Sequence, residues 1–381
     1  MFYKVNLKVY YEALKVKYKK LLNPKYDPYL PLTKGILLSP SSYTFEMYKK
    51  SKLALSFSKS DLDPRSWQIK ARKKLVELSG YDSIRPKPIT VKDFPEQKLS
   101  NDVFKKKVYI RVSPKLDLPI NLLFKKPLKN NMPVFIFLAG STSGVHVGWG
   151  EAKVPIDHER IYIGADIGLQ AAKKGYLVIT YEQACYGERL ERHLDKKSKY
   201  RTIDFANHLL LLGKTLMGKG ATEISSVIDW LVLKNNILNI NININKIYLY
   251  GHSSGGTLVQ FAAAMDIRVK GVLASGSVGP IRETIGARGA GGGDSIIPGL
   301  LNWLDTEDII ALIAPRSFVG LSGDKDHIFP FSGVKKVIIS AKAFFIKLRA
   351  EKKINYFKAK GKHQYYNKES WKAWYKFIDP K

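Results

Sequence analysis

A serine with the surroundings of a nucleophile lies in the run Gly251-His252-Ser253-Ser254-Gly255-Gly256. The run follows the apolar stretch Ile247–Tyr250 and precedes a helix-like stretch that starts near Thr257. A serine hydroxyl is a poor nucleophile, so it must face an open cleft beside a base. A tight turn from strand to helix provides this, at the cost of a strained backbone at the serine. The pattern therefore predicts that Ser253 is a nucleophile.

The same turn predicts how an oxyanion would be held. Gly251 and Gly255 are expected to be glycines because side chains there would collide with the neighbouring strand and helix. The amide of Ser254 lies at a helix N-terminus, where it can stabilise a developing oxyanion. We expect the second donor in the Gly/Ser-rich loop Ala139–Gly144, at the amide of Ser141. This loop lacks the Gly-Lys-Ser/Thr ending of a nucleotide-phosphate loop.

A serine nucleophile needs a base, and the base needs an orienting carboxylate. In a strand–turn–helix architecture of this kind both follow the serine, the acid first and the histidine second. Asp324 and Asp326 follow the strand candidate Arg316–Leu321, and His363 follows the last strand candidate, Ile354–Lys358. Loops at the carboxyl ends of parallel strands share one edge of a sheet, where sites are built. We favour Asp326 as the acid because of its spacing within the loop, with Asp324 as the alternative.

These residues resemble the α/β-hydrolase superfamily, and more narrowly its dienelactone-hydrolase and acetyl-xylan-esterase-like branches. The resemblance covers about residues 105–381. It rests on the serine turn, on the acid and histidine loops, and on the segments Ile313-Ala314-Pro315-Arg316 and Tyr181–Arg189. In the last segment Glu188 and Arg189 are expected to form a structural ion pair. One departure is Ala139, which stands where many relatives carry a histidine before the oxyanion glycine.

The resemblance implies ester hydrolysis through an acyl-enzyme. Ser253 would attack the carbonyl carbon, His363 would take its proton, and Asp326 would stabilise the imidazolium. The implied substrate is a small-molecule ester, acetylated or otherwise small or carbohydrate-linked, and no metal or organic cofactor is implied.

Two other functions remain open. A serine peptidase of the prolyl-oligopeptidase kind shares the serine turn and the order of the triad. However, the first hundred residues are too short for a propeller and show no blade repeats. A non-enzymatic protein could instead carry a basic surface on a hydrolase fold.

Apolar strand candidates alternate with helical patterns over most of the chain. The strand candidates are Lys107–Val112, Pro119–Phe124, Val134–Leu138, Tyr176–Tyr181, Lys246–Tyr250, Gly271–Ser275, Arg316–Leu321 and Ile354–Lys358. The helical patterns are Ala165–Lys174, Thr202–Leu233, Thr257–Met265, Phe331–Arg349 and Asn367–Phe377. This alternation predicts an α/β fold of the α/β-hydrolase type, with a mostly parallel sheet covered by helices on both faces.

The first hundred residues differ from the rest. Met1–Leu22 is rich in Tyr and Lys with helix-like spacing, and Asp61–Leu78 is a second helix candidate that Asp61 or Asp63 could cap. Pro86–Pro95 has the composition of a linker or loop.

We therefore expect an N-terminal helical extension over residues 1–100, packed on a catalytic domain over residues 101–381. No apolar run reaches the roughly 18–20 residues needed to cross a bilayer. The N-terminus lacks the apolar region of a secretory signal, so a cytoplasmic location is expected.

The chain has 381 residues and a formal net charge of +30, from 63 Lys+Arg and 33 Asp+Glu. Such a charge can attract nucleic acid or anionic lipid at low salt. The basic residues are spread along the whole chain, however, and residue usage is biased, as in the low-complexity stretch Asn239–Asn245. We therefore interpret the charge as surface and usage bias. Nucleic acid is not an expected partner, and weak association with a membrane surface stays an alternative.

For several further residues, a functional interpretation competes with a simpler structural one. His146, Asp157 and His158 could suggest a metal site, but a solvated or substrate-lining loop is favoured because no helical spacing supports ligation. The single cysteine, Cys185, excludes an internal disulfide and is expected to be a buried small hydrophobe. Gly286–Gly293 is expected to be a flexible loop over the cleft. Trp149 and Trp303 are candidates to line the pocket, or equally to belong to the core.

Overall fold

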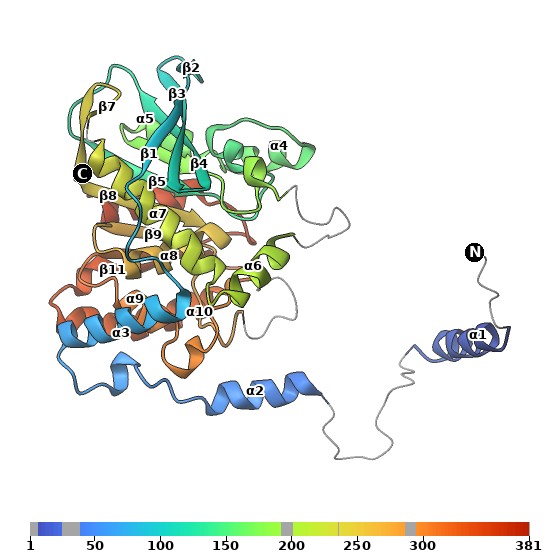
Figure 1. The fold of residues 1–381 in the computed structure, drawn as a ribbon. Helices are drawn as coiled ribbons and strands as arrows, with labels where there is room; N and C mark the ends of the chain where they lie inside the picture. The colour runs from blue at the N-terminus through green and yellow to red at the C-terminus, as the bar shows by residue number, and fades with distance from the viewer. Residues whose placement is uncertain (1–6, 25–38, 192–200, 235, 286–294, 381) are drawn as a thin grey trace. The chain divides into compact units, whose positions relative to one another are not determined.

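The chain divides into two compact units, Met1–Lys50 and Ser51–Lys381. A computed structural model describes residues 7–24, 39–191, 201–234, 236–285 and 295–380 (Figure 1). The first unit holds helices α1 (Leu7–Leu22) and α2 (Pro40–Lys50). The sequence-based boundary near residue 100 stays a prediction. Among the described residues, no helix combines the length and apolar character that crossing a bilayer would require.

The second unit is built on one mixed sheet with the order β1-β3-β4-β6-β5-β8-β9-β10-β11. The strands from β6 through β5 to β11 are parallel, whereas β1, β3 and β4 form an antiparallel edge. The strand bounds are β1 (Ile89–Asp93), β2 (Gln97–Lys98), β3 (Val103–Ser113), β4 (Leu116–Lys125), β5 (Met132–Leu138), β6 (Leu177–Tyr181), β7 (Asn236–Ile237), β8 (Ile240–His252), β9 (Gly271–Ser275), β10 (Ser317–Gly323) and β11 (Ile354–Ala359). The mostly parallel sheet is as predicted.

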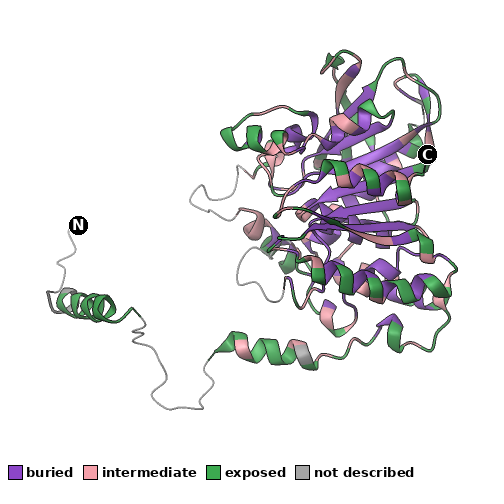
Figure 2. Ribbon diagram, turned by 180° about the vertical axis from the view of Figure 1, so that it is seen from behind, coloured by how far each residue is buried: buried purple, intermediate pink, exposed green. Residues whose placement is uncertain are grey.

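Helices cover both faces of this sheet, and the strand side chains divide between them. In β5, Val134 and Ile136 join one buried cluster, while Phe135 and Phe137 join the other, as the alternation of a strand requires. The first cluster packs against α3 (Pro64–Ser79), α7 (Leu216–Leu233), α8 (Ser254–Met265), α9 (Thr306–Ala311) and α10 (Phe331–Lys347). The second packs against α5 (Ile167–Lys173) and the C-terminal segment, which includes α11 (Asn367–Ala373). Figure 2 shows the buried strands between partly exposed helices.

Helix α3 is fixed to the sheet unit by its own local signals and by its buried face. Asp63 is its N-cap, accepting the amides of Arg65 and Ser66, as one of the two predicted caps. The indole of Trp67 is fully buried and donates to the carbonyl of Leu55 at 2.8 Å. The helix thus belongs to the same unit as the strands.

Two segments differ from the sequence predictions, each for a local reason. The expected linker Pro86–Pro95 contains the edge strand β1, which pairs with β3 through main-chain bonds that composition does not reveal. The expected helix Thr202–Leu233 is two helices, α6 (Arg201–Leu211) and α7. The break follows because Gly213 has a φ of 67° and Thr215 caps α7 by accepting the Gly218 amide.

The low-complexity Asn/Ile stretch forms regular structure. Its first part closes the β7–β8 hairpin, in which Leu238 and Asn239 both have positive φ, as two-residue hairpin loops require. The rest belongs to β8, the strand that leads into the serine turn.

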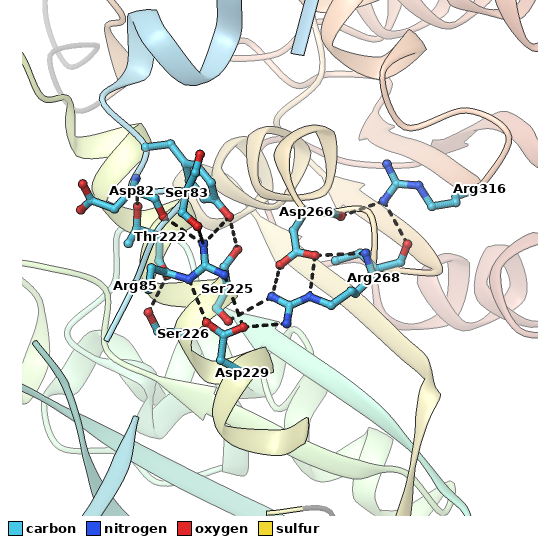
Figure 3. A network of polar contacts seen from close by, with 12 residues as sticks. Asp82, Ser83, Arg85, Thr222, Ser225, Ser226, Asp229, Asp266, Arg268 and Arg316 are labelled. Carbon is cyan, nitrogen blue, oxygen red and sulfur yellow. Dashed lines mark hydrogen bonds and ion pairs between the residues drawn. The ribbon is translucent and has the colours of Figure 1, made fainter. Parts of the chain in front are cut away.

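Charged side chains join α7 to the chain on either side of it (Figure 3). Arg85 donates to Asp229 at 2.9 Å, and Asp229 also accepts from Arg268 at 2.6 Å. Arg268 pairs in turn with Asp266, whose main-chain carbonyl accepts from Arg316. Arg316, in the Ile313–Arg316 segment that follows α9, is therefore hydrogen-bonded to the C-terminal end of α8.

Candidate active site

Five parallel strands end together at the edge that carries the candidate residues. In the registers of the parallel pairs, Leu138 lies opposite Gly251, His252 opposite Ser275, and Gly323 opposite Ala359. The loops after β5, β8, β9, β10 and β11 consequently meet at this edge, as expected for parallel strands.

The turn after β8 has the strained geometry expected of it. Ser253 has φ 52° and ψ −121°, and α8 starts at the next residue. A side chain at Gly251 would place its Cβ 2.3 Å from the carbonyl oxygen of Gly255. One at Gly255 would place it 2.4 Å from that of Ala139. The glycines are required because backbone atoms occupy the space, and the left-handed serine costs about 1–3 kcal/mol.

Ser253, His363 and Asp326 form a continuous hydrogen-bonded line. The Nε2 of His363 lies 2.9 Å from the Oγ of Ser253, and its Nδ1 lies 2.9 Å from the Oδ2 of Asp326. Asp326 is buried, and its Oδ1 accepts the amides of Ile328 and Phe329 at 2.8 and 2.9 Å. Burial works to raise the pKa of Asp326, but the bonds from His363 and these amides hold the pKa below its ordinary value. Since the carboxylate only accepts, Nδ1 carries the imidazole proton and Nε2 is left to accept from the serine.

Asp324 occupies a different position. Its side chain is exposed, and its Oδ1 accepts the amide of Gly361 at 2.9 Å. Of the two candidate acids, only Asp326 contacts His363.

Two further residues, His252 and Tyr365, support this line, and no supporting role was predicted for either from the sequence. The ring of His252 packs on Tyr365 at 4.1 Å and on His363 at 5.1 Å between centroids. Burial lowers the pKa of His252 to about 3, so that ring is neutral. The hydroxyl of Tyr365 accepts the amide of Gly140 at 3.3 Å, which joins the histidine loop to the loop after β5. Apart from the two-residue spacing of His363 and Tyr365, no sequence pattern indicates these contacts.

The loop after β5 lies directly against the serine. A Cβ on Gly140 would lie 3.0 Å from the Cβ of Ser253. The Oγ of Ser141 donates to that of Ser254 at 3.3 Å and accepts from Tyr186 at 3.0 Å. Within the described part of the chain, the amides of Ser141 and Ser254 donate to no protein acceptor. Both predicted donors are therefore available to a bound oxygen.

A cavity of about 370 Å³ opens above Ser253. Its described lining comes from the serine turn, the loop after β5, helix α4 (Pro155–Tyr162), the acid loop and the histidine loop. Ile285 and Ser295 also line it. The expected Gly286–Gly293 loop falls outside the described residues.

Neither tryptophan predicted to line a pocket is among the described lining residues. The indole of Trp149 is buried and donates to Glu151 at 2.7 Å, while the ammonium of Lys105 lies over its ring. Trp303 packs against the core, with the ammonium of Lys74 4.3 Å from its ring centroid. Both rings thus have protein partners elsewhere.

The His146 region is a buried polar cluster, which corrects the expectation of a solvated or substrate-lining loop. His146 lies in a buried 3₁₀ turn, Val145–Trp149, and its Nε2 lies 2.9 Å from the carboxylate of the buried Asp157. His158 is exposed. In the described ranges, no group of three or more His, Cys, Asp or Glu residues is arranged to hold a metal ion.

Glu188 and Arg189 do not form the expected ion pair with each other. Arg189 binds the buried carboxylate of Glu223 through two bonds of 2.8 Å, whereas Glu188 pairs with Lys107. The two side chains therefore form separate ion pairs, each with a residue from another part of the chain. Cys185 is buried as expected, and burial raises the pKa of its thiol to about 12.

Comparison with known proteins gives a family and a set of similar folds. A family model described as "Abhydrolase family" matches residues 33–343. A putative acetyl xylan esterase from Bacteroides fragilis has a TM-score of 0.68 at 17% identity, over 87% of this chain and 85% of that one.

Two further solved structures share the fold. A glucuronoyl esterase from Solibacter usitatus has a TM-score of 0.58 at 16% identity, over 85% and 97% of the two chains. A CE15 glucuronoyl esterase from Teredinibacter turnerae has 0.60 at 14% identity, over 83% and 86%. No curated protein matches the sequence. At these identities the likeness shows the fold alone.

Proposed function

The chain belongs to the Abhydrolase family, and from this premise we propose that it is a serine carboxylesterase that works through an acyl-enzyme. The observation that carries the proposal is the hydrogen-bonded line from Ser253 through His363 to Asp326. This is the arrangement that converts a serine hydroxyl into a nucleophile.

In the first half of the reaction the Oγ of Ser253 attacks the carbonyl carbon of the ester. Its proton passes to Nε2 of His363, and Asp326 stabilises the resulting imidazolium. The oxyanion is held by the amides of Ser254 and Ser141. The bond to the alcohol oxygen then breaks, and the alcohol leaves with the proton from His363.

In the second half a water molecule gives its proton to Nε2 of His363 and attacks the acyl carbon. The bond to Oγ breaks, and the proton returns from His363 to Ser253 as the carboxylic acid is released. Each oxyanion donor is expected to be worth about 3 kcal/mol in the transition state.

The substrate is proposed to be a small or carbohydrate-linked ester. The support is the fold, which is shared with solved structures described as acetyl xylan and glucuronoyl esterases. An open cavity of about 370 Å³ suits a small acyl or sugar group.

The experiment is hydrolysis of a series of 4-nitrophenyl esters that starts from the acetate. The purified protein should release nitrophenolate, and Ser253→Ala should reduce kcat/KM by at least about 10³-fold. A fluorophosphonate probe should label the wild-type protein at Ser253 and leave the variant unlabelled. Full activity in the alanine variant would refute the assignment of the nucleophile, and faster cleavage of aminoacyl-proline substrates than of esters would indicate a peptidase.

A further inference from the structure

The cavity beside Ser253 contains one permanent charge among its described lining residues, the guanidinium of Arg160. The other described lining groups are hydroxyls, an amide, aliphatic and aromatic groups, backbone and two imidazoles, and no carboxylate is among them. Asp326 is buried behind His363 and does not belong to the lining. The reaction proposed above uses the serine, the histidine and the carboxylate, and leaves Arg160 without a role.

Arg160 has only a weak partner within the described protein. It stands in the last turn of α4, and its Nη1 lies 3.5 Å from the Oδ1 of Asp157, at the limit of a hydrogen bond. Asp157 accepts four shorter bonds of 2.5–3.1 Å, from the side chains of Ser143 and His146 and from the amides of Lys153 and Val154.

These four bonds satisfy the carboxylate without the guanidinium. Burial works to raise the pKa of Asp157, but the bonds from Ser143, His146 and the two amides hold the pKa well below its ordinary value. Asp157 is therefore ionised, and both of its carboxylate oxygens already accept hydrogen bonds from these four groups. Among the residues that the structure describes, most of the five N–H donors of Arg160 have no acceptor and are available to a ligand.

The positive charge of Arg160 acts on the interior of the site. Burial raises the pKa of the Tyr365 hydroxyl, while the Gly140 amide and the charge of Arg160 work to lower it. Tyr365 lines the cavity and holds the loop that carries the expected oxyanion donor. Arg160, Tyr365 and Ser253 line the same cavity, so the positive charge borders the space into which the nucleophile opens.

We propose that the substrate ester carries an anionic group, such as a carboxylate, which Arg160 binds while Ser253 attacks the ester carbonyl. This rests on the proposed esterase function and names its substrate class. A guanidinium binds a carboxylate through two parallel hydrogen bonds, and the attraction strengthens where water is partly excluded. Arg160 is then the specificity-determining residue of the cavity.

The test compares matched anionic and neutral esters. On the alcohol side the pair is 4-acetoxybenzoate and 4-acetoxybenzamide. On the acyl side it is mono-4-nitrophenyl adipate and the corresponding primary amide. In the wild-type protein kcat/KM for the anion should exceed that for its neutral partner by at least about 10-fold in one pair, as expected for a charged hydrogen bond. The favoured pair identifies the side of the ester on which the anion lies.

Three substitutions locate the effect. Arg160→Gln should bring the anion-to-neutral ratio close to one, and Arg160→Lys should keep part of the preference. Lys153→Met is the control: it removes a positive charge from an exposed side chain just before α4 that does not line the cavity. Its ratio should stay within about twofold of the wild type, because an exposed charge is screened.

The outcomes separate the two proposals. Hydrolysis of both members of each pair without any preference, or a ratio that Arg160→Gln leaves unchanged, would overturn the role of Arg160 and leave the esterase function intact. If the wild type hydrolyses neither these four esters nor the 4-nitrophenyl series, the esterase function fails. Where none of the four esters is hydrolysed, calorimetry measures the binding of 4-acetoxybenzoate and 4-acetoxybenzamide to Ser253→Ala. Equal affinities for the two compounds would overturn the role of Arg160. Tighter binding of the anion that is lost in Ser253→Ala/Arg160→Gln would support that role.

Discussion

At the scale of single residues, two aspartates two positions apart have different surroundings. Asp326 contacts His363 and is buried, whereas Asp324 is exposed and accepts only a loop amide. We expect Asp326→Asn to lower kcat for 4-nitrophenyl acetate by about 10³–10⁴-fold, because an amide cannot hold His363 in the required tautomer. Asp324→Asn should retain activity within a few-fold. Equal losses in the two variants would contradict the assignment of the acid.

Glu182 gives a prediction on pH. Its side chain is buried, and its Oε2 accepts the amide of Val145 at 2.8 Å. Burial raises the pKa of Glu182 from 4.5 to about 7. The folded state therefore holds this proton more tightly than the unfolded chain. The resulting stabilisation is complete below pH 4.5 and is lost as the pH rises through 7, by about 3 kcal/mol at most.

We expect Glu182→Gln to flatten the loss of thermal stability between pH 5 and pH 8, because glutamine keeps an acceptor for the Val145 amide and cannot ionise. Unfolding curves of both proteins at each pH measure this. The difference between the curves of the two proteins isolates the effect of Glu182. Asp308, whose pKa is also raised by burial, and His252, whose pKa is lowered by burial, contribute equally to both curves. Parallel curves for the two proteins would show that Glu182 is not responsible.

The candidate site could be predicted only in part. Ser253 was identifiable because a nucleophile turn is encoded locally, by glycines whose side chains would meet backbone atoms. Asp326 and His363 followed from the rule that parallel strands share an edge. The contacts of His252, Tyr365 and Arg160 were not predictable, because they join residues that lie far apart in the chain and depend on how loops pack.

At the scale of elements, the packing of α8 against β5 depends on a close backbone contact. A Cβ on Gly255 would lie 2.4 Å from the carbonyl oxygens of both Leu138 and Ala139, and neither backbone atom can move aside easily. We expect Gly255→Ala to reduce the free energy of unfolding by at least about 2 kcal/mol, as overpacking does. Urea unfolding measures the change, and esterase activity should fall with it.

Gly333→Ala in α10 is the matched control. Its nearest new contact would be the Cδ of Pro280 at 3.4 Å, an ordinary distance. Alanine there should change stability by less than about 1 kcal/mol, in the stabilising direction that helix propensity predicts. A loss at Gly333 as large as that at Gly255 would refute the explanation by backbone contact.

The elements themselves were largely visible in the sequence. The central strands are apolar runs because helices cover both faces, and β9 coincides with the predicted Gly271–Ser275. Strands that are held by main-chain pairing with a neighbouring strand, without an apolar pattern of their own, were not predicted. The edge strand β1 is exposed along its length, so composition could not distinguish it from a linker. The family match confirms the resemblance to the α/β-hydrolase superfamily that the motifs suggested.

At the scale of the whole molecule, the net charge of +30 is the most unusual quantity. A diffuse positive charge raises the rate at which the protein encounters anions, and this effect decreases as the salt concentration rises. It does not indicate a particular partner. A single guanidinium in the cavity acts differently, because it discriminates between bound esters at any salt concentration that leaves the complex intact. The comparison of Arg160→Gln with Lys153→Met separates these two contributions.

The division of the chain at Lys50 gives the last prediction, on where the catalytic unit begins. Trp67, Ala71 and Leu75 of α3 are completely or almost completely buried in the core beside the sheet, and Arg72 donates to the carbonyls of Ala264 and Leu312. A chain that starts at residue 51 should therefore keep the unfolding temperature and the esterase activity of the full chain.

A chain that starts at residue 101 should fail to fold, because removal of the Trp67 side chain alone would cost about 3–5 kcal/mol, a large part of the stability of a domain. Circular dichroism, thermal unfolding and hydrolysis of 4-nitrophenyl acetate measure both truncations. If the shorter chain were folded and active, residues 51–100 would be an accessory extension, as the sequence-based boundary proposes. If the longer one were unstable, the first fifty residues would be needed by the catalytic unit.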